Sequence, residues 1–184
     1  MPEQKPGRIL RPQSRGGKYT FPGICIEKLK KMISDHEQYM ELALIEAQKA
    51  EQREEVPIGA VLVSQTGDVI ANAHNQTITK TDPTAHAEII ALRRGAQKLG
   101  NYRLLNTSLY VTVEPCIMCM GAIIHARVSE VIFAAPDPKW GGAGSLYDFS
   151  VDLRLNHGTQ IISGVCCNQS KQLIQNFFRS KRGH

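Results

Sequence analysis

The chain has 184 residues, of which 42% are apolar and 21% are charged, with 22 Lys and Arg against 17 Asp and Glu. These proportions are typical of one globular domain and exclude fibrous, collagen-like and wholly disordered proteins, and no apolar run approaches the roughly 18 residues of a membrane span. Only one regular C-x-x-C spacing occurs among the five cysteines and the first 30 residues lack the apolar core of a signal peptide, so we expect a cytoplasmic protein.

Positive charge gathers at the two ends of the chain. Residues 1–31 contain eight Lys and Arg against two Glu, and residues 179–182 read Arg-Ser-Lys-Arg. Residues 1–24 also hold four of the nine prolines and show no apolar periodicity, which predicts a flexible basic extension over residues 1–30. A single domain is expected over residues 35–182. The extension could grip a polyanion such as RNA, although a simple solvated tail has the same composition.

The predicted elements begin with a helix over residues 35–53, where apolar residues recur every three or four positions. A β-hairpin follows, because the apolar runs 58–63 and 69–73 flank the turn sequence Gln-Thr-Gly-Asp. Asp82 followed by proline is a helix-start signal, and a Gly-Asn pair after Leu99 is a stop signal. These signals predict a second helix from Asp82 to about Leu99.

Strands and helices continue to alternate in the second half of the chain. We expect a strand over residues 109–113, a helix over 115–126 and a strand over 128–134. After a glycine-rich loop, a last strand is expected over 160–165 and a last helix from about residue 170. This order predicts an α/β three-layer sandwich, in which helices flank one mixed five-stranded sheet.

One spacing carries chemistry: His86 and Glu88, and then, after 26 further residues, a Pro-Cys-x-x-Cys motif with Cys116 and Cys119. The two cysteines lie three apart at the start of a helix, so their sulfurs share one face. Together with His86 they offer three ligands of the kind that select zinc and leave a fourth position for water, as in catalytic sites. Glu88 would then act as the general acid and base for that water.

The alternative is a structural zinc site. Its fourth ligand would come from His74, from His125 or from the Cys166-Cys167 pair. Structural sites usually gather their ligands as paired knuckles, and such a site would give Glu88 no role. The spacing therefore favours a catalytic zinc.

The His-x-Glu and Pro-Cys-x-x-Cys motifs resemble those of the zinc-dependent cytidine and purine deaminases. Further runs resemble the tRNA adenosine deaminases of bacteria, over about residues 35–182. These runs are residues 56–61, 82–88, 101–104, 110–116, 137–146 and 177–179. The resemblance implies a cytidine deaminase-like fold, a homodimer with one zinc ion per subunit, and hydrolysis of adenosine to inosine at the wobble position of a tRNA anticodon loop. Water would attack carbon 6 of the adenine, and ammonia would leave.

The resemblance also implies a set of substrate-binding residues. They are Asn75, Ala87, Asp137, Lys139, Phe178 and Arg179. Asn75 would contact the target nucleotide, and Asp137 and Lys139 would contact the flanking ribose and phosphate. Phe178 and Arg179 would line an RNA groove by stacking and charge. Ordinary turn, loop and helix-end roles would suit the same residue types. Where the family usually continues with Arg, this chain has Gln76, which removes one positive charge.

Two other functions remain open from the sequence. A zinc-dependent deaminase of a free base or nucleoside, such as guanine, cytosine or cytidine, would share the zinc site and the sheet. It would not need the basic last helix or the loop from Asp137 to Ser145 for its substrate. A zinc-stabilised RNA-binding module without enzymatic activity would leave Glu88 unexplained.

Overall fold

The structure is a computed structural model that describes residues 26–182, with side chains described from Asp35 onward. Most of the predicted basic extension, residues 1–25, lies outside the described residues. The elements in chain order are α1 (Ile26–Glu51), β1 (Gly59–Ser64), β2 (Val69–His74), α2 (Ala87–Leu99), β3 (Thr107–Val113), α3 (Ile117–His125), β4 (Glu130–Ala135), β5 (Gln160–Ser163) and α4 (Cys167–Arg182). Among these helices, none combines the length and apolar character needed to cross a membrane.

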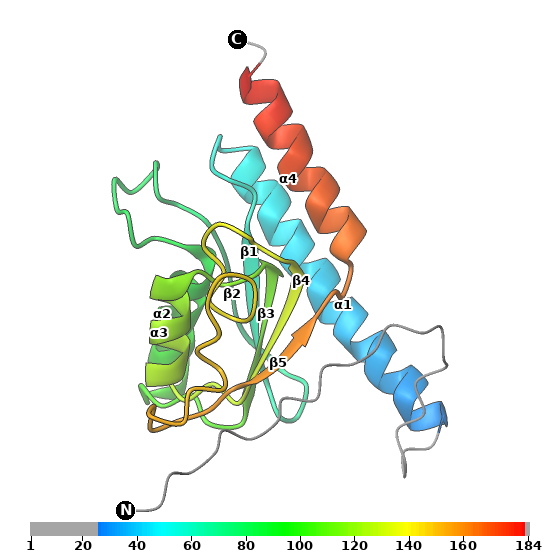
Figure 1. Cartoon of the computed structure of the whole chain (residues 1–184), viewed down its shortest axis with the longest axis vertical. Coiled ribbons are helices and arrows are strands. Elements are labelled where there is room, and N and C mark those ends of the chain that lie inside the picture. The colour runs from blue at the N-terminus through cyan, green and yellow to red at the C-terminus, as the bar shows by residue number, and fades with distance from the viewer. Residues whose placement is uncertain (1–25, 183–184) are drawn as a thin grey trace, which may run out of the picture.

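The five strands form one mixed sheet in the order β2-β1-β3-β4-β5. Strand β1 runs antiparallel to both β2 and β3, whereas β3, β4 and β5 are parallel to one another. Helices α2 and α3 cover one face of the sheet, and α1 and α4 cover the other (Figure 1). The predicted three-layer α/β sandwich is therefore confirmed.

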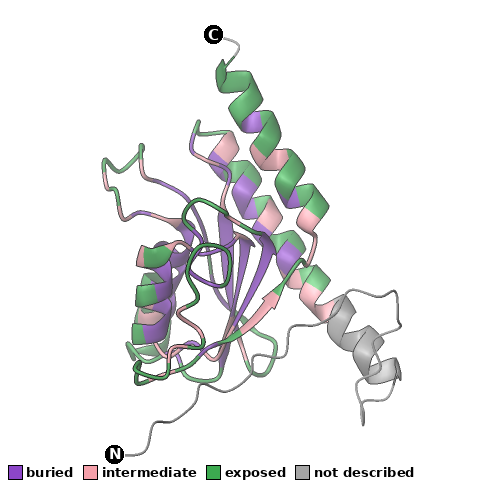
Figure 2. Ribbon diagram, in the orientation of Figure 1, coloured by how far each residue is buried: buried purple, intermediate pink, exposed green. Residues whose placement is uncertain are grey.

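Alternation along the strands builds a separate core on each face of the sheet. In β1, Ala60 and Leu62 join the cluster under α2 and α3, while Val61 and Val63 join the cluster under α1. Successive side chains of a strand point to opposite faces, so one apolar run supplies both cores. The central strands are accordingly buried, whereas exposed residues lie on the outer sides of the helices, in the loops and on the edge strands β2 and β5 (Figure 2).

The predicted hairpin is confirmed. Strands β1 and β2 pair antiparallel around a turn in which Gly67 has a φ of 91° and donates its N–H to the carbonyl of Ser64 at 3.0 Å. This backbone conformation favours glycine, which explains why a Gly-Asp pair closes the turn.

The predicted start of the second helix is wrong. Helix α2 begins at Ala87, not at Asp82, although it ends at Leu99 as predicted, with Gly100 in the left-handed conformation. The Asp82 carboxylate instead accepts the backbone N–H of Thr84 at 2.8 Å and its hydroxyl at 2.7 Å. The Asp-Pro sequence that predicts a helix start forms a tight turn here. A short Asp side chain can bond the backbone two residues ahead both at a helix start and in a turn.

Helix α1 also differs from its prediction, since it begins at Ile26, nine residues before the expected start at residue 35. Residues 26–34 contain no proline or glycine that would stop a helix from extending. The last five residues of the predicted extension, 26–30, thus belong to this helix.

Candidate active site

The starts of α2 and α3 meet at the end of the sheet where β2 and β3 finish, and they bring the predicted metal-binding residues together. His86 is the N-cap of α2, with φ of −71° and ψ of 152°, and Cys116 is the N-cap of α3, with φ of −70° and ψ of 172°. Glu88 and Cys119 lie in the first turns of these helices. Because His86 has an extended backbone while Glu88 is already helical, two residues that would diverge in mid-helix can face one site.

The three candidate ligands have the spacing that zinc requires. The Nδ1 atom of His86 lies 3.7 Å from the Sγ of Cys116 and 3.5 Å from the Sγ of Cys119. Zinc–sulfur and zinc–nitrogen bonds of about 2.3 and 2.0 Å at tetrahedral angles put sulfur and nitrogen about 3.5 Å apart. The donor set and its distances therefore fit a zinc ion.

Within residues 35–182, no fourth protein ligand joins this group. Among the described residues, the cluster that could hold a metal consists of His86, Cys116 and Cys119 alone. His74, one of the alternative ligands, instead places its Nδ1 atom 2.9 Å from the carboxylate of Glu46. Three ligands without a fourth are the arrangement of a catalytic zinc site, in which the last position takes water or substrate.

The two sulfurs of the cluster share a proton: pairing with Cys116 and burial raise the pKa of Cys119, so the negative charge lies on Cys116. Hydrogen bonding with the Cys119 thiol, and more weakly with His86, lowers the pKa of Cys116 to about 4. The sulfur of Cys116 in turn raises the pKa of His86. The N-termini of α2 and α3 add partial positive charge that favours thiolate.

Glu88 lies beside the cluster as a buried acid. Its side chain is only 3% exposed, and within the described part of the chain its Oε2 atom has no hydrogen-bond partner. Burial raises the pKa of this carboxyl above its ordinary value. A buried carboxyl oxygen that the protein leaves unpaired can bond a water or a substrate, which is what a general acid and base must do.

Asn75 connects the end of β2 to the start of α2. Its side chain is buried, and its Oδ1 atom accepts the backbone N–H of Ala87 at 2.8 Å. The N–H of Ala87 is thereby bonded within the protein. The contacts of both residues with a substrate stay predictions, but their position next to His86 is established.

Glu114 is a site residue to which the sequence assigned no role. Its buried carboxylate accepts the backbone N–H groups of Asp137, Ala143 and Ser145, each at 3.0 Å, and the hydroxyl of Ser145. We call residues 137–145 the site loop. The sequence signal that could have indicated this role is a lone glutamate at the junction of an apolar strand with the Pro-Cys motif. A carboxylate placed there can organise a loop that lies next to the metal-binding residues.

The site loop also contacts the metal-binding turn directly. Gly141 forms an antiparallel bridge with Cys116, and a Cβ on Gly141 would come within 2.4 Å of the Glu114 side chain. Asp137 and Lys139, the predicted substrate residues of this loop, are part-exposed and exposed. The Asp137 carboxylate accepts the backbone N–H of Lys139 at 3.0 Å, so it shapes the loop's first turn.

A second buried glutamate holds the segment that follows Asn75. Glu55 accepts the backbone N–H groups of Thr79 at 2.7 Å and Ile78 at 3.2 Å, and the Thr77 hydroxyl at 3.0 Å. Burial would raise the pKa of Glu55, but these hydrogen bonds outweigh it and lower the pKa. This role of Glu55 was not predicted from the sequence.

Phe178 and Arg179 lie apart from the cluster. Both belong to α4, which packs beside α1 on the sheet face opposite α2 and α3 (Figure 1). Phe178 is 44% exposed, and its neighbour Phe177 is buried. The α4 end is also held by an ion pair between Lys181 and Glu54 at 3.4 Å. The RNA contacts of this pair stay predictions.

The chain is similar to several known proteins. The model for the cytidine and deoxycytidylate deaminase zinc-binding region matches residues 33–135. A tRNA-specific adenosine deaminase from Haemophilus influenzae is 48% identical over 79% of this chain and 84% of its own length. One from Bacillus subtilis is 43% identical over 82% of this chain and 92% of its own length.

Two solved structures are also similar. One comes from a study of A-to-I editing by tRNA:A34 deaminases at the wobble position of transfer RNA. It is 44% identical, with a TM-score of 0.71, over 74% of this chain and 98% of its own. A guanine deaminase from Nitrosomonas europaea shares the fold, with a TM-score of 0.68 and 19% identity over 89% of this chain and 98% of its own.

Proposed function

The chain belongs to the zinc-binding cytidine and deoxycytidylate deaminase family, and from this membership we propose that it hydrolyses adenosine to inosine at the wobble position of a tRNA anticodon. The observation that carries the proposal is the buried Glu88, with one unpaired oxygen, beside a three-ligand metal cluster. Relatives at 43% and 48% identity that are named tRNA-specific adenosine deaminases support the choice of substrate.

The metal-binding role is assigned to His86, Cys116 and Cys119, with one zinc ion per subunit. Zinc in such a site leaves one coordination position open and lowers the pKa of a water there to about 7. The protein supplies the two sulfurs and the imidazole nitrogen from two different helix starts, which fixes their relative positions.

Glu88 is proposed to move the protons of the reaction. It takes a proton from the attacking water and delivers it to a ring nitrogen of the adenine, so that the water oxygen can bond to carbon 6. It then takes the proton of the new hydroxyl on carbon 6 and passes it to the amino group on that carbon, the carbon–nitrogen bond breaks, and ammonia leaves. Adenosine and water are thereby converted to inosine and ammonia.

Recognition of the RNA is proposed for six residues. They are Asn75, Ala87, Asp137, Lys139, Phe178 and Arg179. A single-stranded loop suits this site because its unstacked bases expose edges that side chains can reach, whereas the bases of an A-form stem lie in a deep groove. The proposed substrate, a tRNA, functions in the cytoplasm, so we place the protein in that compartment. A role for the basic residues 1–30 in holding RNA stays a prediction.

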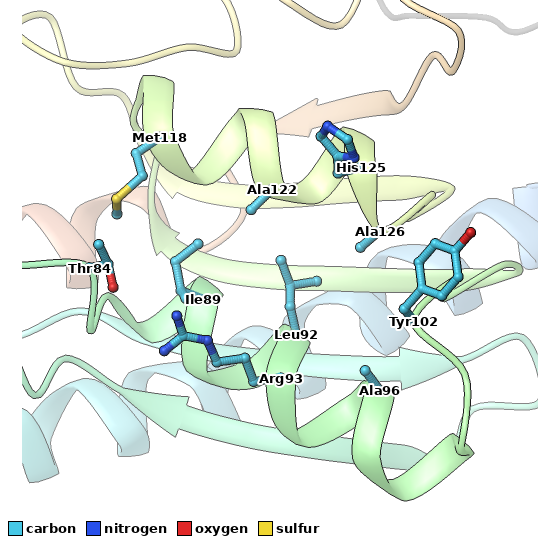
Figure 3. A pocket seen from close by; sticks show the side chains of 10 residues that line it. All are labelled: Thr84, Ile89, Leu92, Arg93, Ala96, Tyr102, Met118, Ala122, His125 and Ala126. Carbon is cyan, nitrogen blue, oxygen red and sulfur yellow. The ribbon is translucent and has the colours of Figure 1, made fainter.

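A second copy of this chain is the proposed partner at the groove between α2 and α3 (Figure 3). This cavity of about 460 Å³ lies mainly among apolar side chains. Helix α3 reads Ile-Met-Cys-Met-Gly-Ala-Ile-Ile-His, yet Met118 and Ala122, which line the groove, are only part-buried. A helix that is apolar on all sides is normally buried on all sides, so a partner surface would complete its burial.

The homodimer has a direct test. Ala122 lines the groove, and the Ala122→Arg substitution should shift the protein from dimer to monomer in sedimentation velocity experiments. A wild-type protein that sediments as a monomer at every concentration would overturn the proposed partner.

The function is tested by incubating the zinc-loaded protein with a pool of unmodified tRNAs and measuring inosine and ammonia. Free adenosine, guanine and cytidine serve as parallel substrates, and zinc-stripped protein is the control. We expect inosine at an anticodon adenosine only, and none without zinc. Turnover confined to a free base or nucleoside would keep the zinc chemistry but overturn the RNA substrate.

A further inference from the structure

Trp140 is the single tryptophan of the chain, and it lies on the site loop with 64% of its surface exposed. An isolated exposed ring is common on protein surfaces and needs no explanation by itself. What distinguishes this ring is its position and the rigidity of the backbone that carries it.

The backbone around Trp140 is held on both sides. The Asp137 carboxylate accepts the N–H of Trp140 at 3.3 Å, and the Asp137 carbonyl accepts the N–H of Gly141 at 2.9 Å. The next residue, Gly142, donates its N–H to the carbonyl of Pro115 at 2.9 Å. The ring is therefore presented by a loop whose shape is fixed before any ligand arrives, so little ordering cost would accompany binding.

This backbone also runs next to the metal cluster. Gly141 is bridged to Cys116, so the Cα of Trp140 lies within about 10 Å of the Cα of that ligand. Cys116 and His86 are the partly exposed members of the cluster, whereas Cys119 is buried. An exposed ring is thus carried by backbone that runs close to the two partly exposed ligands.

The surroundings of Trp140 fit a nucleic acid better than a second copy of the chain. Lys139, the preceding residue, is exposed and adds a positive charge. Trp140 does not line the groove between α2 and α3 that is assigned to a second copy. Within the described residues its ring also stacks on no other aromatic side chain. An aromatic ring beside a cation is the arrangement by which proteins hold single-stranded nucleic acids.

We propose that Trp140 stacks on the base of a nucleotide that adjoins the target adenosine, and so determines how the anticodon loop is positioned over the metal cluster. The inference rests on the proposed function, because it concerns the substrate of that same site. It assigns a substrate contact to a residue with no role in the metal binding or in the proton transfer.

The chain offers a direct measurement, since Trp140 is its only tryptophan and all tryptophan emission reports on it. The zinc-loaded Glu88→Gln variant, which should bind without turnover, is titrated with an anticodon stem-loop that contains the target adenosine. We expect strong quenching of the emission. Stem-loops in which the nucleotide on one side or the other of the target lacks its base should identify the stacked neighbour by loss of the quenching.

Kinetics on the same stem-loop give a second measurement. Trp140→Ala should raise KM for inosine formation by roughly tenfold and change kcat little, whereas Trp140→Phe should keep most of the wild-type KM. Leu99→Ala is the matched control, because it removes an exposed apolar side chain at the far end of α2 and should leave KM unchanged. Thermal melts should show no loss of stability in Trp140→Ala, since its ring is exposed.

The outcomes separate this inference from the proposed function. A wild-type protein that forms no inosine in any tRNA would overturn the proposed function itself. An active wild-type protein whose emission ignores the stem-loop, and whose Trp140→Ala variant keeps its KM, would overturn only the stacking. Emission that changes with protein concentration and not with RNA would assign the ring to contact with a second copy, which also overturns it.

Discussion

Glu114 and Cys116 lie on the same turn between β3 and α3, so the carboxylate that holds the site loop is covalently tied to a metal-binding thiol. The loop returns to that turn through the bridge between Gly141 and Cys116. Loop shape and metal geometry are consequently fixed by one short segment. A change in the shape of the site loop should therefore affect the geometry of the metal-binding residues, and this coupling can be tested.

Replacing Glu114 with Gln should loosen the site loop while zinc stays bound. The amide of Gln supplies donors where the carboxylate now accepts hydrogen bonds from Asp137, Ala143 and Ser145. We expect kcat/KM on tRNA to fall at least about tenfold, as a buried hydrogen-bond network is broken. Hydrogen exchange at the amides of Ala143 and Ser145 should become faster. Unchanged exchange at those amides would contradict the anchoring role.

The Glu88→Gln substitution should separate proton transfer from metal binding. Loss of a general acid and base costs about 10² to 10⁴ in rate, so inosine formation should fall by that factor. The zinc content, measured by atomic absorption, should remain at one ion per chain. His86→Ala is the matched control and should lose zinc and activity together. If Glu88→Gln also loses its zinc, the proton-transfer assignment is wrong.

Two substitutions at Asn75 can separate a structural role from a substrate contact. Asn75→Asp keeps an oxygen for the N–H of Ala87 but removes the amide nitrogen, whereas Asn75→Ala removes both. We expect Asn75→Asp to keep thermal stability near that of the wild type, and both variants to lose about tenfold or more in kcat/KM. Full activity of Asn75→Asp would mean that the side chain only joins β2 to α2.

Protonation of Glu55 should make the folded protein less stable in acid. The pKa of Glu55 in the folded protein is lowered below its ordinary value of 4.5, so the carboxylate stabilises the fold above about pH 4.5. That stabilisation is lost as the pH falls through the lowered pKa. Urea unfolding should show that Glu55→Gln costs about 1–3 kcal/mol at pH 7 and that this cost shrinks below pH 4.5. The exposed Glu37→Gln variant is the control, and a cost for Glu55→Gln that does not vary with pH would contradict the prediction.

The metal cluster could be predicted from sequence because its members are identified by local spacing. Cys116 and Cys119 share one helix start, and Glu88 follows His86 by two residues at another. Apolar runs likewise predicted the strands, and the alternation of strands with helices predicted the layers. These features depend on residues that are close in the chain, where periodicity and capping act.

The loop anchors could not be predicted in this way. Glu114 bonds residues 23 to 31 positions away, and Glu55 bonds residues 22 to 24 positions away, so their roles exist only after the sheet has formed. The start of α2 was predicted wrongly for a related reason. Asp82 can cap a helix or close a turn, and the helix instead begins at Ala87, whose N–H is bonded by the side chain of Asn75, twelve residues earlier.

His86 and its sulfur partners lie far apart along the chain, and this links metal binding to folding. Cys116 and Cys119 follow His86 by 30 and 33 residues, and each side of the site is a helix start whose position depends on the neighbouring strands. An unfolded chain would have to close that long segment before all three residues could share one ion. Because the folded chain brings the three ligands together and the unfolded chain does not, zinc binds the folded state more tightly and should raise the free energy of unfolding.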